Sequence, residues 1–241
     1  MDAAEQLGEN FELSRYLHAR SVSRDLVTEI GHQLVSGMSE QEAHELAQDV
    51  FRQRGITKFW HPTKIRFGKN TLCTFREESD PAVKLVLGDV YYIDIGPVVE
   101  GHEGDYGETF VCGSGSDPLI SASRELFRFT QERWRHDRLT GAELYDLASG
   151  RAREMELELD RRSAGHRCGD FPHALFHKGK LQDFVATPSA GLWVLEIHVV
   201  DPKRERAAFF EDILGVESLG ANLVGPARAL CAFDKDTGPR G

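Results

Sequence analysis

Two aspartates, one histidine and two glutamates occur along the chain in an order and a setting that suit metal binding. Asp94 lies inside an apolar run, Asp105 follows after ten intervening residues, and a histidine and two glutamates come later. Carboxylate oxygens with one imidazole suit Mn²⁺, Fe²⁺, Co²⁺ or Zn²⁺, and a bridging carboxylate can hold two such ions about 3.5 Å apart. Because a buried carboxylate needs a cation or donors beside it, the apolar run favours a ligand over a turn residue. The sequence therefore predicts a dinuclear centre whose ligands are Asp94, Asp105, His166, Glu196 and Glu211.

The short sequence motifs around these residues resemble those of the pita-bread metallopeptidases, the family of methionine aminopeptidase, aminopeptidase P and prolidase. Asp94 is followed by Ile95 and Gly96 in the manner of that family, and the second aspartate lies eleven positions on. His166 begins a His-x-x-Gly-x-x-x-His phrase that ends at His173. The chain is identified as an outlying member of this family that consists of the catalytic domain only.

This resemblance implies an α+β architecture, the pita-bread fold, with a pseudo-symmetric, mixed or antiparallel curved sheet covered by helices. We expect a single domain over residues 1–241. Hydrophobic spacing predicts two helices between about residues 11 and 55 and two more at about 118–135 and 140–158, with capping boxes that begin at Ser39 and Thr140. Strands are expected around the aspartates and in the last third of the chain, and the two halves should meet near residue 117.

The resemblance also implies a mechanism. Asp105 and Glu211 would bridge two divalent ions, with Mn²⁺ as the first expectation and Co²⁺, Fe²⁺ or Zn²⁺ as alternatives. A hydroxide held between the ions would attack a peptide carbonyl. Glu196 would carry a proton to the leaving nitrogen as well as bind metal, and His173 would contact the substrate and stabilise the oxyanion.

Two departures from the family pattern concern the substrate. Members carry a histidine upstream of the first aspartate, but residues 68–75 contain none, so His61, seven residues earlier, is the candidate for that substrate contact. After Asp105 the family often reads Asp-x-Thr-Arg-Thr, whereas this chain has Gly107 and Glu108. Glu108 near the ions would favour a cationic substrate group such as a free amine, unless the side chain points away along its strand.

Composition narrows the classes of partner. The 241 residues carry 39 acidic and 29 basic side chains, a net charge of −10, which disfavours generic binding to nucleic acid or anionic membranes. The amino terminus lacks a signal-peptide pattern and no apolar run could span a bilayer, so we expect a cytoplasmic protein. The expected partner is a small peptide or small molecule, and the chain is expected to be a monomer or a homodimer.

Three functions are compatible with these residues. The first is an aminopeptidase or dipeptidase of the Xaa-Pro or a related type. The second is a pita-bread enzyme that cleaves a C–N or another bond of a non-peptide small molecule, which the missing upstream histidine favours. The third is a binding protein on an inert scaffold, against which the complete ligand set argues.

Overall fold

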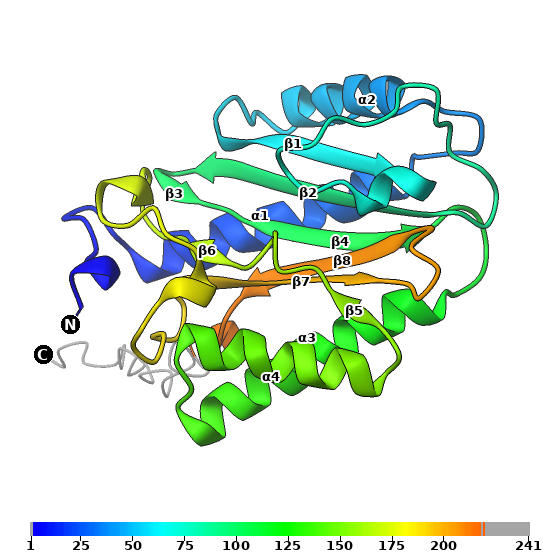
Figure 1. Cartoon of the computed structure of the whole chain (residues 1–241). Coiled ribbons are helices and arrows are strands. Elements are labelled where there is room, and N and C mark those ends of the chain that lie inside the picture. Colours follow the sequence, from blue (N-terminus) through cyan, green and yellow to red (C-terminus); the bar gives the residue numbers. More distant parts are fainter. Residues whose placement is uncertain (1, 218, 220–241) are drawn as a thin grey trace, which may run out of the picture.

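The protein is built around one curved sheet whose strands run antiparallel to their neighbours (Figure 1). The structure, a computed structural model, describes residues 2–217 and residue 219. The strand order is β1-β2-β4-β8-β7-β5, with β3 paired to β2 and β6 paired to β7. The strands are β1 (Phe59–Phe67), β2 (Val90–Val99), β3 (His102–Glu103), β4 (Tyr106–Val111), β5 (Glu158–Leu159), β6 (His166–Arg167), β7 (Trp193–Val200) and β8 (Ala207–Ile213).

Four long helices and four short 3₁₀ turns accompany the strands in the described part of the chain. The helices are α1 (Leu13–Gly31), α2 (Glu40–Gln53), α3 (Pro118–Asp137) and α4 (Gly141–Glu154). The 3₁₀ turns are η1 (Ala3–Glu5), η2 (Gly68–Leu72), η3 (His173–Leu175) and η4 (Leu181–Asp183). Within residues 2–217 and 219, no helix combines the length and the apolar character needed to cross a membrane.

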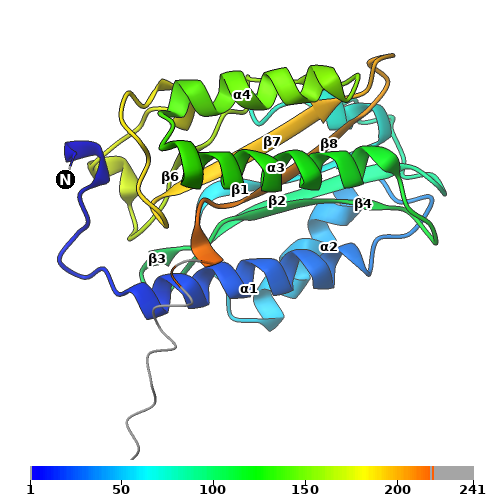
Figure 2. The ribbon, with the colours of Figure 1, turned by 90° about the horizontal axis from the view of Figure 1, so that it is seen from below.

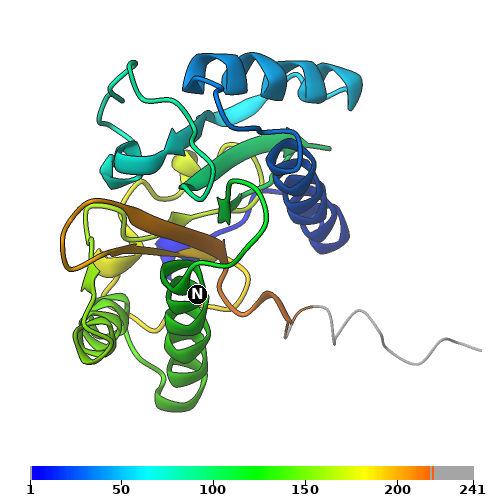
Figure 3. The same ribbon diagram turned by 90° about the vertical axis from the view of Figure 1, so that its right-hand side faces the viewer.

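The two halves of the chain repeat one plan. Helices α1 and α2 precede β1, β2 and β4, and helices α3 and α4 precede β5 to β8. Helix α1 packs on β2 and β4, while α3 packs across β7 and β8 (Figure 2). Seen end-on, the first helix pair lies above the second, with the sheet against both (Figure 3). The expected α+β pita-bread architecture, with halves that meet near Asp117 at the start of α3, is confirmed.

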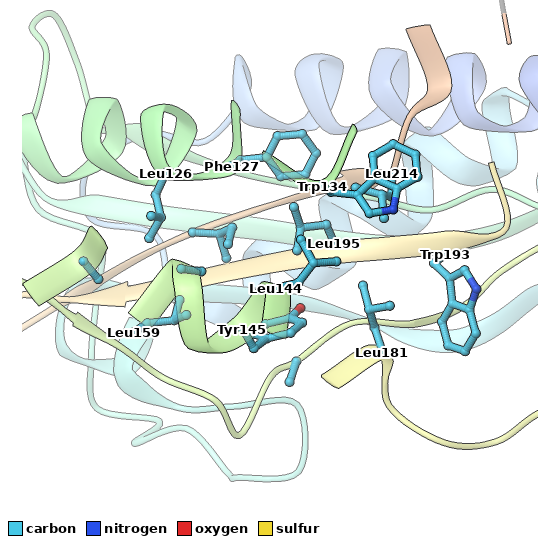
Figure 4. Close-up of a cluster of buried hydrophobic side chains, with 14 of the residues drawn as sticks. Leu126, Phe127, Trp134, Leu144, Tyr145, Leu159, Leu181, Trp193, Leu195 and Leu214 are labelled. Carbon is cyan, nitrogen blue, oxygen red and sulfur yellow. The ribbon is translucent and has the colours of Figure 1, made fainter. Parts of the chain in front are cut away.

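Side chains of one face of the sheet pack against the helices and form the core. On β7 this face carries Trp193, Leu195 and Ile197, each 0% exposed, and Figure 4 shows the first two among side chains of α3 and α4. On β2 it carries Ile93 and Ile95, which pack with α1 and α2. Since successive residues of a strand point to opposite faces, the residues between these apolar ones face away from the helices.

The helix predictions are confirmed, with one boundary corrected. Ser39 and Thr140 each accept a hydrogen bond from the backbone amide three residues on, and the glutamate there accepts one from the backbone amide of the cap residue. The last predicted helix was too long at its carboxyl end. Helix α4 ends at Glu154, and Glu158 pairs with Val200 in the sheet instead.

We predict that Ser39→Ala lowers the free energy of unfolding by about 1 kcal/mol, because the first turn of α2 loses its side-chain cap. Denaturant unfolding followed by circular dichroism measures this. Ser36→Ala is the matched control, since Ser36 is an exposed serine outside α2. Equal stability of the two variants would contradict the capping assignment.

Candidate metal centre

The four central strands bring acidic residues into one row on the face turned away from the helices. Asp94 of β2 is paired with Gly107 of β4, Gly107 with Glu211 of β8, and Glu211 with Glu196 of β7. Three carboxylates therefore stand on adjacent positions across the sheet, with a glycine between two of them. These strands come from distant parts of the sequence. The register of their pairing aligns the three carboxylates.

Gly107 makes room for this row. A Cβ atom at Gly107 would lie 2.6 Å from Oε1 of Glu211 and 2.5 Å from the ring of Phe209, closer than real contacts allow. The threonine that the family often has at this position would therefore clash in this chain. The departure from the family pattern is explained by the bulk of Phe209 and the position of Glu211.

Asp105 joins the row from the loop before β4, and His166 joins it from the short strand β6. Asp105 directly precedes β4 and is 0% exposed. His166 of β6 has its Nε2 3.0 Å from Oδ2 of Asp105 and 3.7 Å from Oε1 of Glu196. The structure thus brings the five predicted ligand residues together. That they bind metal stays a prediction.

His61 also lies in this cluster. Its Nε2 is 3.5 Å from Oδ1 of Asp94 and 3.5 Å from Oδ1 of Asp105. His61, Asp94 and Asp105 form one group able to hold a cation, and Asp105, His166 and Glu211 form another. His61 therefore lies among the predicted ligand residues, whereas the sequence suggested only a contact with the substrate.

Burial makes the cluster electrostatically unstable as a set of bare anions. Oδ1 of Asp94, both carboxylate oxygens of Asp105 and Oε1 of Glu211 are buried and accept no hydrogen bond from the described residues. Burial, with the neighbouring carboxylates, raises the pKa of Asp94 to about 6. Burial and the charges of Asp105 and Asp94 raise the pKa of Glu211 well above its ordinary value.

The pKa of the His166 imidazole is also raised, because anions surround it. Burial alone would lower the pKa of His166, but Asp105 and Glu196 raise it to about 10. Burial likewise opposes ionisation of Asp105, yet the facing His166 and His61 hold the pKa of its carboxyl below its ordinary value. Both shifts report a site that attracts positive charge.

These residues fit divalent cations. Carboxylate oxygens that accept no hydrogen bond in a buried cluster are the oxygens that a cation would satisfy, and imidazole nitrogens beside them complete a mixed oxygen and nitrogen set. Asp94, Asp105, His166, Glu196 and Glu211 would hold such ions. This donor set accepts several first-row metals, so it names no single one.

His173 lies beside the cluster and is held by a buried carboxylate that sequence analysis missed. Glu103 of β3, 1% exposed, accepts hydrogen bonds from Nδ1 of His173 at 2.7 Å, from its backbone amide at 3.0 Å and from Gly169 at 3.2 Å. The ring of His173 is stacked on that of His166, with centroids 6.1 Å apart. The predicted position of His173 near the site is therefore met, with Glu103 as its anchor.

Trp60 is the second residue that sequence analysis missed. Its ring lies against His61, His166 and His173 at centroid distances of 4.3, 4.8 and 5.3 Å. Its Nε1 donates to the carbonyl of Gly104 at 3.0 Å, which fixes the ring. The aromatic residue directly before a histidine was the only signal in the sequence.

The prediction that Glu108 contacts substrate is corrected. Glu108 is the neighbour of Gly107 on β4 and so points to the helix-covered face. There it accepts a hydrogen bond from Tyr106 at 2.8 Å and forms an ion pair with Arg124 of α3. Glu108 therefore ties a helix to the sheet and places no negative charge beside the substrate.

The cluster forms the floor of a pocket of about 300 Å³. Aromatic walls are supplied by Trp60, Phe75, Tyr92 and Phe209. Four basic residues also line it, namely Arg76, Arg162, Lys178 and Lys180. Arg162 is already paired with Glu77 and Asp160, whereas Arg76 and Lys178 form no salt bridge within the described residues.

Comparison with known proteins places the chain in a family. The sequence model of metallopeptidase family M24 matches residues 14–217. The fold is that of a metallopeptidase-type catalytic domain, and the chain belongs to metallopeptidase family M24. Comparison with curated protein sequences gave no significant match.

Solved structures share the fold at low sequence identity. The X-Pro aminopeptidase of Thermotoga maritima superposes with a TM-score of 0.66 at 21% identity, over 88% of this chain and 62% of that one. The prolidase of Pyrococcus horikoshii gives 0.65 at 18%, over 87% and 60%. The methionine aminopeptidase of Thermotoga maritima gives 0.65 at 14%, over 87% and 98%. The chain thus spans about three fifths of the first two structures and nearly all of the third.

We predict that Glu103→Ala lowers the free energy of unfolding by about 1–3 kcal/mol, because three partly or fully buried donors lose their acceptor. Chemical denaturation measures the change. Glu78→Ala removes an exposed carboxylate and is the control. If both variants unfold at the same denaturant concentration, Glu103 does not anchor His173.

Proposed function

We propose that the protein is a metal-dependent aminopeptidase or dipeptidase of the Xaa-Pro or a related type. The observation that carries this proposal is the buried cluster of carboxylates and imidazoles at the floor of a small aromatic pocket. Membership of family M24 supports the reaction class. Structures named as X-Pro aminopeptidase, prolidase and dipeptidase share the fold, which supports the substrate class without fixing it.

Two bound divalent ions would supply an acidified water molecule and a Lewis acid for the carbonyl oxygen. The protein's own residues would position and move protons around them. Glu196 is oriented by the backbone amide of Gly165, which donates to its Oε2 at 2.9 Å, while its Oε1 faces His166. Glu196 is therefore placed to exchange a proton with a group above the cluster and to pass it to a leaving nitrogen.

The backbone of Glu196 is fixed as well as its side chain. The hydroxyl of Tyr145 on α4 donates to the carbonyl of Glu196 at 3.0 Å and accepts from its amide at 3.2 Å. Tyr145 is 0% exposed, so the helix face and the acidic row are coupled through one buried hydroxyl. Such rigid support suits a proton-transfer residue, which must hold hydrogen-bond distance to its partner.

His173 would bind the substrate carbonyl or the oxyanion derived from it. Nδ1 of His173 donates to the Glu103 carboxylate, so Nε2 is the nitrogen left for substrate. Nε2 would donate to a carbonyl oxygen or oxyanion in the doubly protonated ring, whose charge the Glu103 carboxylate would balance. The ring lines the pocket beside His166. Glu103 is a positioning residue for His173 in this scheme.

The basic residues of the pocket favour a short substrate with a free carboxylate. Arg76 and Lys178 carry charges that no salt bridge in the described part of the chain neutralises, and both line the pocket. The volume of about 300 Å³ lies at the small end of ligand sites. With Glu108 directed to the opposite face, Arg76 and Lys178 are the unpaired charges on the pocket wall, which favours a substrate carboxylate over the cationic group expected from sequence.

A non-peptide substrate is the second candidate. The family's upstream histidine has no counterpart in residues 68–75, and Phe75 lines the pocket from this stretch. A small anionic molecule with a hydrolysable C–N bond would use the same floor and the same basic residues. Mn²⁺ as the native ion, a cytoplasmic location, a single domain over residues 1–241 and a monomeric or dimeric state stay predictions.

We predict that protein reconstituted with Mn²⁺ or Co²⁺ releases the first residue from members of a panel that includes Xaa-Pro dipeptides and Met-initiated peptides. Mass spectrometry of the products measures this. Asp105→Ala should lose both metal binding and turnover with the fold retained, because a buried bridging carboxylate is removed. Silence across the panel in protein shown to hold two ions would favour the non-peptide substrate.

We predict that Arg76→Gln combined with Lys178→Gln raises KM for dipeptides with a free carboxylate by roughly tenfold, because the double variant loses charge-assisted hydrogen bonds to that carboxylate. A tenfold change corresponds to about 1.4 kcal/mol. KM for the same dipeptides with an amidated carboxyl end should stay unchanged. Steady-state kinetics on the two substrate series measures the difference. Equal changes in both series would show that these residues do not recognise the carboxylate.

A further inference from the structure

Each half of the sheet contributes one histidine and two carboxylates to the cluster, in the same chain order. The first half supplies His61, Asp94 and Asp105, and the second supplies His166, Glu196 and Glu211. The histidine lies on the strand next to the first carboxylate's strand in both halves, since β1 pairs with β2 and β6 pairs with β7. The pseudo-symmetry of the fold therefore extends to the side chains of the site.

The two imidazoles are oriented in the same way. Nδ1 of His61 lies 3.0 Å from the carbonyl oxygen of Pro62, and Nδ1 of His166 lies 2.8 Å from that of Arg167. A carbonyl oxygen can only accept, so Nδ1 carries the proton in both rings and Nε2 of the neutral ring presents a lone pair to the carboxylates. A backbone carbonyl that fixes the tautomer in this way is the usual support of a metal-binding histidine.

The distances around His61 suit a shared cation better than a direct hydrogen bond. Its Nε2 lies 3.5 Å from a carboxylate oxygen of Asp94 and 3.5 Å from one of Asp105, at the outer limit for N–H···O contact. Two ligand atoms at tetrahedral angles on one ion, each about 2.1 Å from it, are separated by about 3.4 Å. Both of these oxygens are buried and accept no hydrogen bond in the described part of the chain.

The position of His61 is built into its surroundings. A Cβ atom at Gly96, the residue opposite on β2, would lie 2.4 Å from Nε2 and 2.1 Å from Cδ2 of His61. The same Cβ atom would lie 2.5 Å from Nε1 of Trp60, whose ring packs edge-on against His61, and the side chain of His61 is only 8% exposed. The space left at Gly96 and the ring of Trp60 therefore place the imidazole beside the carboxylates.

We propose that His61 is a sixth protein ligand of the metal centre, so that each of the two ions has one imidazole. This inference rests on the dinuclear centre of the proposed function. His61 would share one ion with Asp94 and Asp105, while His166 serves the other. Metal binding would use the Nε2 lone pair of His61, so His61 would not contact the substrate. No residue would then replace the upstream histidine that other members of the family carry.

X-ray absorption at the zinc edge of the native protein loaded with Zn²⁺ tests this without any substitution. The proposal predicts one imidazole per zinc in the scattering, that is, two per pair of ions. One imidazole shared by two ions would overturn it, because His166 alone would then bind metal. Failure of the native protein to bind Zn²⁺, Mn²⁺ or Co²⁺ at all would instead contradict the proposed function.

Calorimetric titration with Mn²⁺ and with Zn²⁺ adds a test by substitution. His61→Ala should weaken one of two binding events by at least about 100-fold, since even outer-sphere partners of metal ligands contribute 10–100-fold. His136→Ala, which removes an exposed histidine near the end of α3, should bind as the native protein does. Native-like binding of both ions by folded His61→Ala, with folding checked by circular dichroism, would overturn the assignment.

Discussion

Mutual repulsion of carboxylates buried at one spot is the constraint on which this structure depends. Asp94, Asp105 and Glu211 are at most 9% exposed, and several of their oxygens accept no hydrogen bond in the described residues. Taking such anions out of water side by side is costly unless positive charge accompanies them. The raised pKa values of Asp94 and Glu211 and of His166 express the same demand. Divalent cations would meet it, and the chemistry proposed for the pocket follows from their presence.

The scaffold meets this demand by symmetry and by small residues. Antiparallel pairing across β2, β4, β8 and β7 sets three carboxylates in a row on one face, while the other face packs on the helices. Gly107 and Gly96 remove the side chains that would block Glu211 and His61. Each half of the chain then adds a histidine beside its own strands. Packing of the apolar face against the helices thus supplies the stability that offsets the repulsion between the carboxylates on the other face.

Part of this site could be predicted from sequence and part could not. The spacing of Asp94 and Asp105 and the phrase around His166, through their resemblance to the family, pointed to five residues that the structure brings together, while their role as metal ligands stays a prediction. The capping boxes likewise gave the starts of α2 and α4. Contacts between residues far apart in the sequence, such as that of Glu103 with His173, could not be predicted. The face chosen by Glu108 depends on the register of β4, and the direction of His61 depends on register shifts on both sides of it in β1.

Electron paramagnetic resonance of the protein titrated with Mn²⁺ tests the central claim most directly. If the buried carboxylates and imidazoles hold two ions that share bridging ligands, the second equivalent of Mn²⁺ should convert the spectrum to that of an exchange-coupled pair. Asp105→Ala should abolish the coupled signal. A spectrum of isolated Mn²⁺ at every ratio, or of free Mn²⁺ only, would contradict the account.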